Sequence, residues 1–168
     1  SSAVDSGSIL ATNGGSGNIF YWALTEIRDP NGNFMRHRYT RINDYGVNDN
    51  KVPGYQLYPD TITYTGNGTT EGLYQVKFLR DRDVDDYAAV RRKDVQIDAR
   101  GGFKRVTADL LRQVEVSFNN TLIRRYDFRY NDNPYGDGRT GTAFNKTLLT
   151  TVVQYGDDGE EFNRHRFE

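Results

Sequence analysis

The chain has 168 residues, with 22 basic and 23 acidic side chains and no cysteine. This balance of charge excludes a strong field that would recruit nucleic acid or an anionic membrane, so we expect neither partner. The absence of cysteine excludes disulfides, thiolate metal sites and cysteine nucleophiles. Because 12 tyrosines, 9 phenylalanines and 17 glycines accompany a single methionine and a single tryptophan, the composition favours strands and turns over helices.

Residues 1–19 are rich in serine and glycine and contain only isolated apolar side chains. Such a stretch buries too little surface to offset the entropy lost on ordering, so we predict a flexible linker or a cloning remnant there. Residues 20–168 have the length of one domain, and we predict a single β-rich domain that is a fragment of a larger protein. No apolar run in it is long enough for a membrane span, so we expect no membrane insertion by this domain.

The first predicted element is a β-hairpin. Residues 20–27 read as a strand, residues 29–32 (Asp-Pro-Asn-Gly) as a turn, and residues 34–40 as the returning strand. Residues 43–60 contain Asn, Asp, Gly and two prolines and read as a long loop. Strands at 61–65 and 73–79, separated by a Gly-Asn-Gly turn, then form a degenerate second hairpin.

The middle of the chain is highly charged. Residues 80–94 predict an exposed loop or a single helical turn, and residues 95–98 a short strand. Residues 100–103 (Arg-Gly-Gly-Phe) predict a tight reversal of the kind that glycine makes easily.

A further hairpin is predicted around Asn119 and Asn120. A three-residue loop made of Asn119, Asn120 and Thr121 would place Val114 opposite Tyr126 on an apolar face. It would also place Glu115 opposite Arg125 on a polar face, as expected of a sheet with one wet side.

This hairpin belongs to a repeated pattern. Two apolar residues three positions apart, a polar turn and a basic-aromatic end recur in residues 24–39, 111–126 and 149–167. Self-similarity of this kind is typical of folds that stack one supersecondary unit. The sequence therefore predicts an all-β fold of antiparallel repeated hairpins, arranged as a sandwich, a barrel or an extended meander.

The order of short motifs along residues 20–168 resembles a known family. Residues 22–39 are similar to a YD/Rhs repeat. The later motifs are Tyr58-Pro-Asp-Thr-Ile-Thr-Tyr-Thr-Gly, Tyr74-Gln-Val-Lys-Phe, Arg91-Arg-Lys-Asp-Val, Arg100-Gly-Gly-Phe, Leu111-Arg-Gln-Val, Arg125-Tyr-Asp-Phe-Arg-Tyr, Leu148-Leu-Thr-Thr-Val and Gln154-Tyr-Gly. Their order resembles the SpvB-like N-terminal region of bacterial virulence proteins and of toxin-complex B components.

The resemblance implies a non-catalytic structural or interaction module of a large secreted toxin-type protein. Such a module would contribute to a β-rich shell or docking surface, with neighbouring domains or subunits as its partners. It would be secreted or extracellular, or lie on the bacterial cell surface. The Glu-x-Glu pair of ADP-ribosylating relatives is absent from the chain, so the resemblance implies no catalytic residue and no enzyme activity.

The residue types and their spacing give few candidates for a catalytic or metal-binding site. His37 and His165, the two histidines, occupy equivalent places in their repeats and are interpreted as structural strand residues. No Gly-x-Ser-x-Gly nucleophile elbow and no P-loop occurs, so we expect no catalytic residue and no organic cofactor. Calcium is the one candidate metal ion, weighed against a plain polar loop, because oxygen ligands cluster at Asp81, Asp83, Asp85 and Asp86. A second cluster is formed by Asn131, Asp132, Asn133 and Asp137.

The alternative function is that of a carbohydrate-binding, adhesin-like module, with calcium possible. Aromatic rings in or near the predicted loops are suited to stacking on sugar faces, although core or rim packing is the more common role of tyrosine at strand ends. The candidate rings are Trp22, Tyr45, Tyr55, Tyr58, Tyr87 and Tyr135.

Overall fold

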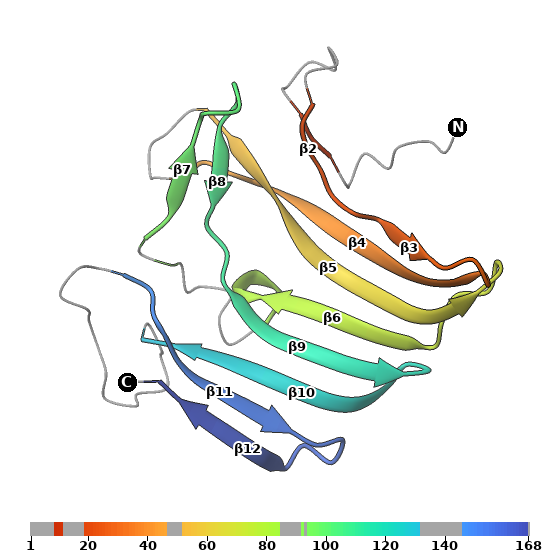
Figure 1. The fold of residues 1–168 in the computed structure, drawn as a ribbon. Helices are drawn as coiled ribbons and strands as arrows, with labels where there is room; N and C mark the ends of the chain where they lie inside the picture. The colour runs from red at the N-terminus through yellow and green to blue at the C-terminus, as the bar shows by residue number, and fades with distance from the viewer. Residues whose placement is uncertain are drawn as a thin grey trace. The chain divides into compact units, whose positions relative to one another are not determined.

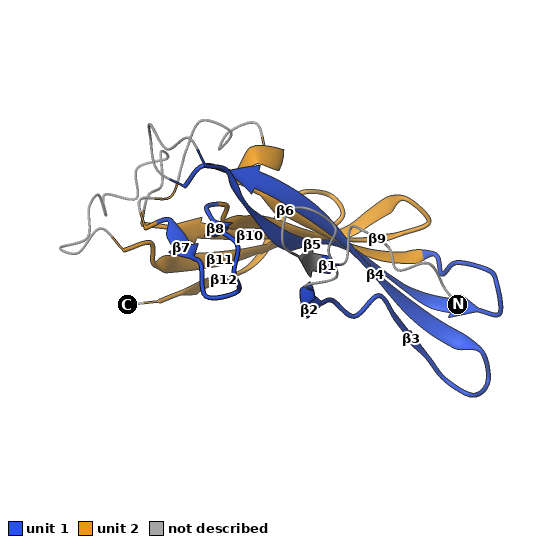
Figure 2. Ribbon diagram, turned by 90° about the horizontal axis from the view of Figure 1, so that it is seen from above, with its two compact units in different colours: residues 1–73, 95–108 blue, residues 74–94, 109–168 orange. Residues whose placement is uncertain are grey.

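The structure is a computed structural model that describes residues 9–11, 19–46, 52–84, 92, 94–131 and 146–167. Within these residues the fold is all-β, as predicted, and a short 3-10 helix is the only helical element. The chain divides into two compact units, residues 1–73 with 95–108 and residues 74–94 with 109–168 (Figure 2). Among the described residues, no helix is long and apolar enough to cross a membrane.

The described residues of unit 1 form seven strands, most of which are labelled in Figure 1. They are β1 (Ile9–Ala11), β2 (Ile19–Trp22), β3 (Glu26–Arg28), β4 (Asn33–Asp44), β5 (Gly54–Asn67), β7 (Gln96–Asp98) and β8 (Arg105–Thr107). Strands β3, β4 and β5 pair antiparallel in this order, and β8 joins β5 by a parallel bridge and β7 by antiparallel pairing. Strands β1 and β2 form a separate two-stranded sheet, so β1 lies within the stretch predicted to be a linker.

The predicted first hairpin is formed by β3 and β4. Its turn is closed by the Asp29 carboxylate, which accepts hydrogen bonds from the backbone N–H groups of Asn31 (2.9 Å) and Asn33 (2.8 Å). Gly32 has a φ of 84°, in the left-handed region that glycine adopts readily. The predicted strand at 20–27 is divided into β2 and β3, because residues 23–25 lie outside both.

The prediction of a long loop over residues 43–60 is wrong. Strand β4 runs to Asp44 and β5 begins at Gly54, so half of the segment belongs to two long paired strands. Pro59 lies inside β5, where the register shifts between Arg38 and Tyr39 of β4. A shift of this kind accommodates a residue that has no N–H to donate, and a proline normally argues against a central strand.

The core of unit 1 is small and aromatic. Phe34, Tyr55 and Val106 are buried, and the Tyr55 ring stacks on Phe103 with centroids 5.0 Å apart and planes 8° apart. The guanidinium of Arg41 lies 3.7 Å from the centroid of the Tyr55 ring. The side chains therefore hold β5 against the segment that leads into β8.

Unit 2 contains β6 (Tyr74–Arg80), the 3-10 helix η2 (Asp81–Asp83), β9 (Leu111–Phe118), β10 (Thr121–Tyr130), β11 (Leu149–Tyr155) and β12 (Glu161–Arg166). Its strands pair antiparallel in the order β12-β11-β10-β9-β6, so an open meander is the arrangement found among the three predicted. Val153 and Arg112 are its most deeply buried side chains.

The predicted hairpin at Asn119 is present as β9 and β10, but its loop has two residues rather than three. Phe118 pairs with Thr121, while Asn119 and Asn120 have φ values of 48° and 64°. A register shift between Leu122 and Arg124 then restores the predicted pairs Glu115 with Arg125 and Val114 with Tyr126. The observed turn is one residue shorter than the predicted one. The bulge offsets this difference, so the residue pairs beyond it are those that were predicted.

Candidate functional site

The most exposed run of apolar side chains in the described part of unit 1 lies along β2 and β3. We call it the β2–β3 apolar segment, and its members are each 49–61 % exposed: Phe20, Tyr21, Trp22, Leu24 and Ile27. Since consecutive residues of a strand point to opposite faces, both faces of β2 expose aromatic rings.

The segment is held in place by its neighbours in unit 1. The Phe20 ring packs edge-on against Phe103, with centroids 5.9 Å apart. The carbonyl of Leu24 accepts a hydrogen bond from the Tyr39 hydroxyl (2.9 Å), and the carbonyl of Thr25 accepts one from the backbone N–H of His37 (2.8 Å). The rings are therefore presented by an ordered backbone.

The exposed apolar surface of the segment is divided between the two faces of β2. With large side chains of roughly 150–250 Å² each about half exposed, the five residues present on the order of 400–500 Å² of apolar surface. This total lies within the range of the largest apolar patch on a typical soluble protein, and such a patch is often functional.

Strand β12 forms an edge of the unit 2 sheet and also has an exposed ring, that of Phe162. Its backbone differs from the β2–β3 apolar segment in ways that protect the edge. The register of β11 and β12 shifts between Gln154 and Tyr155, so β12 carries a bulge at its start. The Asn163 side chain accepts a hydrogen bond from the backbone N–H of Arg164 (2.7 Å). Bulges, charged residues and a locally bonded N–H all disfavour the addition of another strand, so β12 has the features of a protected edge.

The residues predicted to bind sugar are in different environments. Trp22 and Tyr45 are exposed, whereas Tyr55 belongs to the core and Tyr58 is half-buried. The Tyr58 hydroxyl accepts a hydrogen bond from the backbone N–H of Ala108 (3.1 Å). Tyr87 and Tyr135 lie outside the described residues.

The predicted calcium ligands are separately engaged where the structure describes them. The buried Asp81 carboxylate accepts hydrogen bonds from the backbone N–H groups of Leu110 (3.3 Å) and Arg82 (3.2 Å). The carboxylate of Asp83 accepts two from Arg80, at 3.0 Å from the backbone N–H and 2.8 Å from Nε. Asp85 and Asp86 lie outside the described residues, in which no group of three metal-binding side chains occurs, and the calcium site stays a prediction.

The titration of Asp81 is unusual. Burial, reinforced by the neighbouring carboxylate of Asp109, raises the pKa of Asp81 from 3.8 to about 6. Asp109 is itself bound by Arg82, whose Nε lies 2.6 Å from Oδ2 of Asp109. Because these groups bond to backbone and to each other, the arrangement is that of a structural polar network.

The two histidines occupy strand positions, as their place in the repeats predicts. His37 of β4 pairs with Ile62, and His165 of β12 pairs with Val152. The Nε2 atom of His165 lies 3.2 Å from the side-chain nitrogen of Asn163.

Sequence reasoning missed the β2–β3 apolar segment as a surface and named only Trp22 from it. A signal was present, because residues 20–24 (Phe-Tyr-Trp-Ala-Leu) are apolar at every position instead of alternating. Such a run is typical of a strand covered on both faces. In this chain most of the run is exposed instead, with Ala23 its buried member.

No protein-family model and no curated protein matches the chain. Solved structures do match it. The N-terminal domain of the effector protein SpvB from Salmonella typhimurium strain LT2 is 19% identical with a TM-score of 0.62, over 80% of this chain and 50% of that one. A chain of the TcdB2-TccC3-Cdc42 structure is 14% identical with a TM-score of 0.65, over 94% of this chain and 9% of that one.

A chain of the Photorhabdus luminescens Tc holotoxin pore, in a form mutated in TccC3, is similar to the same degree. It is 14% identical with a TM-score of 0.63, over 93% of this chain and 9% of that one. At these identities the matches establish the fold, and they confirm at that level the predicted resemblance to an SpvB-like, toxin-complex region. The chain spans half of the SpvB domain and about a tenth of the two Tc chains.

Proposed function

We propose that this chain is a non-catalytic structural and interaction module of a large secreted toxin-type protein, in which it contributes to a β-rich shell or docking surface. The observation that carries the proposal is the exposed β2–β3 apolar segment. Support also comes from the fold, which occurs in an effector domain and within much longer chains of toxin complexes.

The proposed partner is a neighbouring domain or subunit that covers the β2–β3 apolar segment. Aromatic side chains are the residues that most often dominate the energy of an interface, and Trp22 with its neighbouring rings supplies them. Burial of roughly 400–500 Å² of apolar surface stabilises docking by about 10 kcal/mol before the entropy of association is subtracted.

The proposal is tested by substitution in the full polypeptide that carries the chain. We expect Trp22→Ser combined with Leu24→Ser to weaken association with the neighbouring domain or subunit, measured by size-exclusion chromatography and pull-down. Phe162→Ser, which removes an exposed ring from the protected edge β12, is the matched control and is expected to leave assembly intact. Equal assembly of the double variant and the wild type would overturn the proposal.

The non-catalytic part of the proposal is supported by the positions of the perturbed carboxylates. Asp81, whose pKa is raised, is buried in unit 2 and bonded to backbone N–H groups. Asp98, which lines a cavity in unit 1, has its pKa lowered by hydrogen bonds from Arg100. A general acid or base needs a pKa shifted toward neutral pH together with access to substrate. Asp81 has such a shift but is buried, and Asp98 lines a cavity but has its pKa shifted away from neutral pH.

A carbohydrate-binding role is the second candidate, because Trp22 and Tyr45 expose their rings. Binding to a panel of glycans, with calcium and with chelator, tests it directly. Trp22→Ala is expected to abolish ring-dependent binding, and a folded chain that binds no glycan in either buffer would exclude this role.

A further inference from the structure

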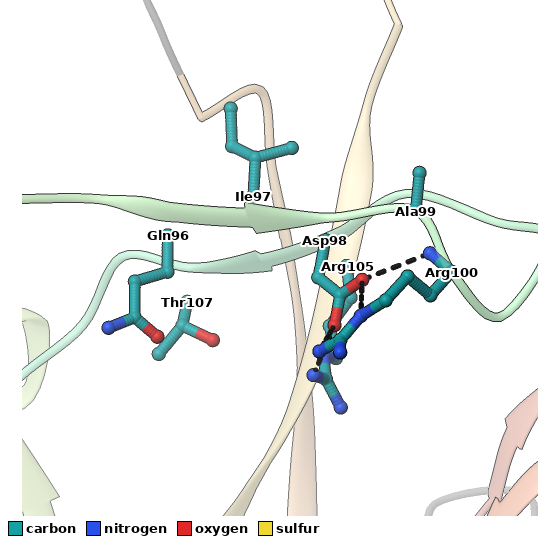
Figure 3. Close-up of a pocket in the computed structure, with 7 residues that line it drawn as sticks. All are labelled: Gln96, Ile97, Asp98, Ala99, Arg100, Arg105 and Thr107. Atoms are coloured by element: carbon teal, nitrogen blue, oxygen red, sulfur yellow. Dashed lines mark hydrogen bonds and ion pairs between the residues drawn. The ribbon is translucent and has the colours of Figure 1, made fainter.

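The hairpin formed by β7 and β8 has one polar face. Gln96, Asp98, Arg100, Arg105 and Thr107 lie on one side of it, and Ile97 and Ala99 lie on the other (Figure 3). This division follows from the pairing, because Gln96 is opposite Thr107 and Asp98 is opposite Arg105. A cavity of about 500 Å³ is lined by these seven residues, all of which belong to unit 1.

Two guanidinium groups converge on a single carboxylate in this cavity. Arg100 donates to Asp98 from Nε (3.0 Å) and Nη2 (2.8 Å), and Arg105 donates to it from Nη2 (2.8 Å). The backbone N–H of Arg100 also donates to Asp98, at 2.9 Å. Two positive charges against one negative charge leave the cluster with a net charge of +1.

The bonds to Asp98 leave donors of both arginines uncommitted to that carboxylate. A guanidinium carries five N–H donors, and the Nη1 groups of Arg100 and Arg105 take no part in the bonds to Asp98. Arg100 is 87 % exposed, so an ion reaches it from solvent without displacing protein.

Asp98 acts in this cluster as a positioning residue. Hydrogen bonds from Arg100, with the charge of Arg105 nearby, hold the pKa of Asp98 well below its ordinary value, so it stays ionised at neutral pH. It thereby fixes two long side chains that would otherwise lose conformational entropy when a ligand bound. The tight reversal at Gly102, with a φ of 78°, fixes the backbone between the two arginines.

We propose that the polar face of the β7–β8 hairpin is a binding site for an anionic oxygen group, a carboxylate or a phosphate, held by Arg100 and Arg105. Paired guanidinium groups match the spacing of such oxygens and bind them through charge-assisted hydrogen bonds. Gln96 and Thr107 add uncharged polar groups at the wall of the cavity, where they contact further oxygens of the ligand. The site shares no lining residue with the β2–β3 apolar segment, although Phe20 of that segment packs against Phe103 in the reversal between the two arginines. Substitutions in the cavity and in the segment therefore test the anion site and the proposed docking function separately.

The test is a titration of the isotopically labelled 168-residue chain followed by NMR. Sodium acetate and sodium phosphate are the two probes, and sodium chloride keeps the ionic strength constant. We expect saturable shifts in the backbone N–H signals of β7 and β8 and in the Nε–H signals of both arginines, with a dissociation constant on the order of millimolar. Tighter acetate binding assigns the site to protein carboxylates, and tighter phosphate binding assigns it to phosphate-bearing ligands.

Substitutions make the test specific. Arg105→Gln and Arg100→Gln are each expected to weaken binding about tenfold, since each removes a charged donor. Arg28→Gln is the matched control, because Arg28 is also ion-paired in unit 1 but lies outside the cavity. The proposal is overturned if shifts do not exceed those with chloride alone, or if the two cavity variants bind as well as Arg28→Gln.

Discussion

Gly72 is the described glycine that leaves the least room for a side chain beside another part of the backbone. A Cβ placed on it would lie 1.7 Å from the carbonyl oxygen of Tyr64, which belongs to β5. The approach is held by the adjacent Glu71, whose carboxylate accepts hydrogen bonds from Arg38 (2.8 Å) and the Thr63 hydroxyl (2.9 Å). The segment after β5 is therefore folded back onto its own strand.

We predict that Gly72→Ala lowers the free energy of unfolding by about 3 kcal/mol or more, because backbone must move to admit the methyl group. Urea denaturation measures the change. Gly156→Ala is the control, since the nearest atom there is Oδ1 of the flexible Asp158 side chain at 2.8 Å. Equal effects of the two substitutions would show that the close approach at Gly72 is absent.

Asp81 gives a prediction about pH. Its pKa in the folded chain is about 6, above the ordinary 3.8, so folding favours the protonated form. The free energy of unfolding therefore falls as pH rises from about 4 to about 6, and the loss persists above that range. Asp81→Asn removes the ionised form and keeps one oxygen that accepts from Leu110, while its amide nitrogen replaces the oxygen that accepts from Arg82. We expect it to stabilise the chain by about 1–3 kcal/mol at pH 7.5 and to flatten this part of the profile.

Asp83 provides the control of opposite sign. Its hydrogen bonds from Arg80 outweigh the effect of burial and lower its pKa, so its contribution to stability is present at neutral pH and is lost in acid. Asp83→Asn is accordingly expected to destabilise the chain at pH 7.5. A destabilising Asp81→Asn at the same pH would contradict the structural reading of Asp81.

At the scale of elements, the β9–β10 turn depends on two residues with positive φ. This geometry fits a type I′ turn, in which glycine is preferred at the second position, here occupied by Asn120 with a φ of 64°. We predict that Asn120→Ala destabilises by about 1 kcal/mol, since a Cβ disfavours the left-handed region, and that Asn120→Gly is neutral or stabilising. Thermal unfolding distinguishes them, and equal melting temperatures would argue against this turn.

The hairpins that sequence reasoning predicted are those with an explicit turn signal. Residues 29–32 and Asn119-Asn120 both restrict the backbone locally, and a local restriction can be seen in a sequence. The β4–β5 pairing was missed because Pro53 and Pro59 indicate a loop, and only the partner strand shows that Pro59 sits beside a register shift. The bulge after Leu122 was missed for the same reason, since it depends on both strands.

At the scale of the whole molecule, the order of motifs predicted a fold that sequence identities of 14–19% do not by themselves reveal. The candidate surface was less predictable. The run from Phe20 to Leu24 has the composition of a covered strand, and only its exposure in the structure singles it out as the proposed docking surface. The cavity beside β7 was equally hidden, because it requires Arg100 and Arg105 to meet across a hairpin.

The most direct test of the docking account is the solvent accessibility of Trp22, the only tryptophan in these 168 residues. Hydroxyl-radical footprinting with peptide-level mass spectrometry measures its oxidation rate in this chain alone and in the assembled full polypeptide. The account predicts rapid oxidation of Trp22 in the isolated chain, where it is 61 % exposed, and strong protection in the assembly. Equally rapid oxidation in both would contradict the claim that the β2–β3 apolar segment is a docking surface.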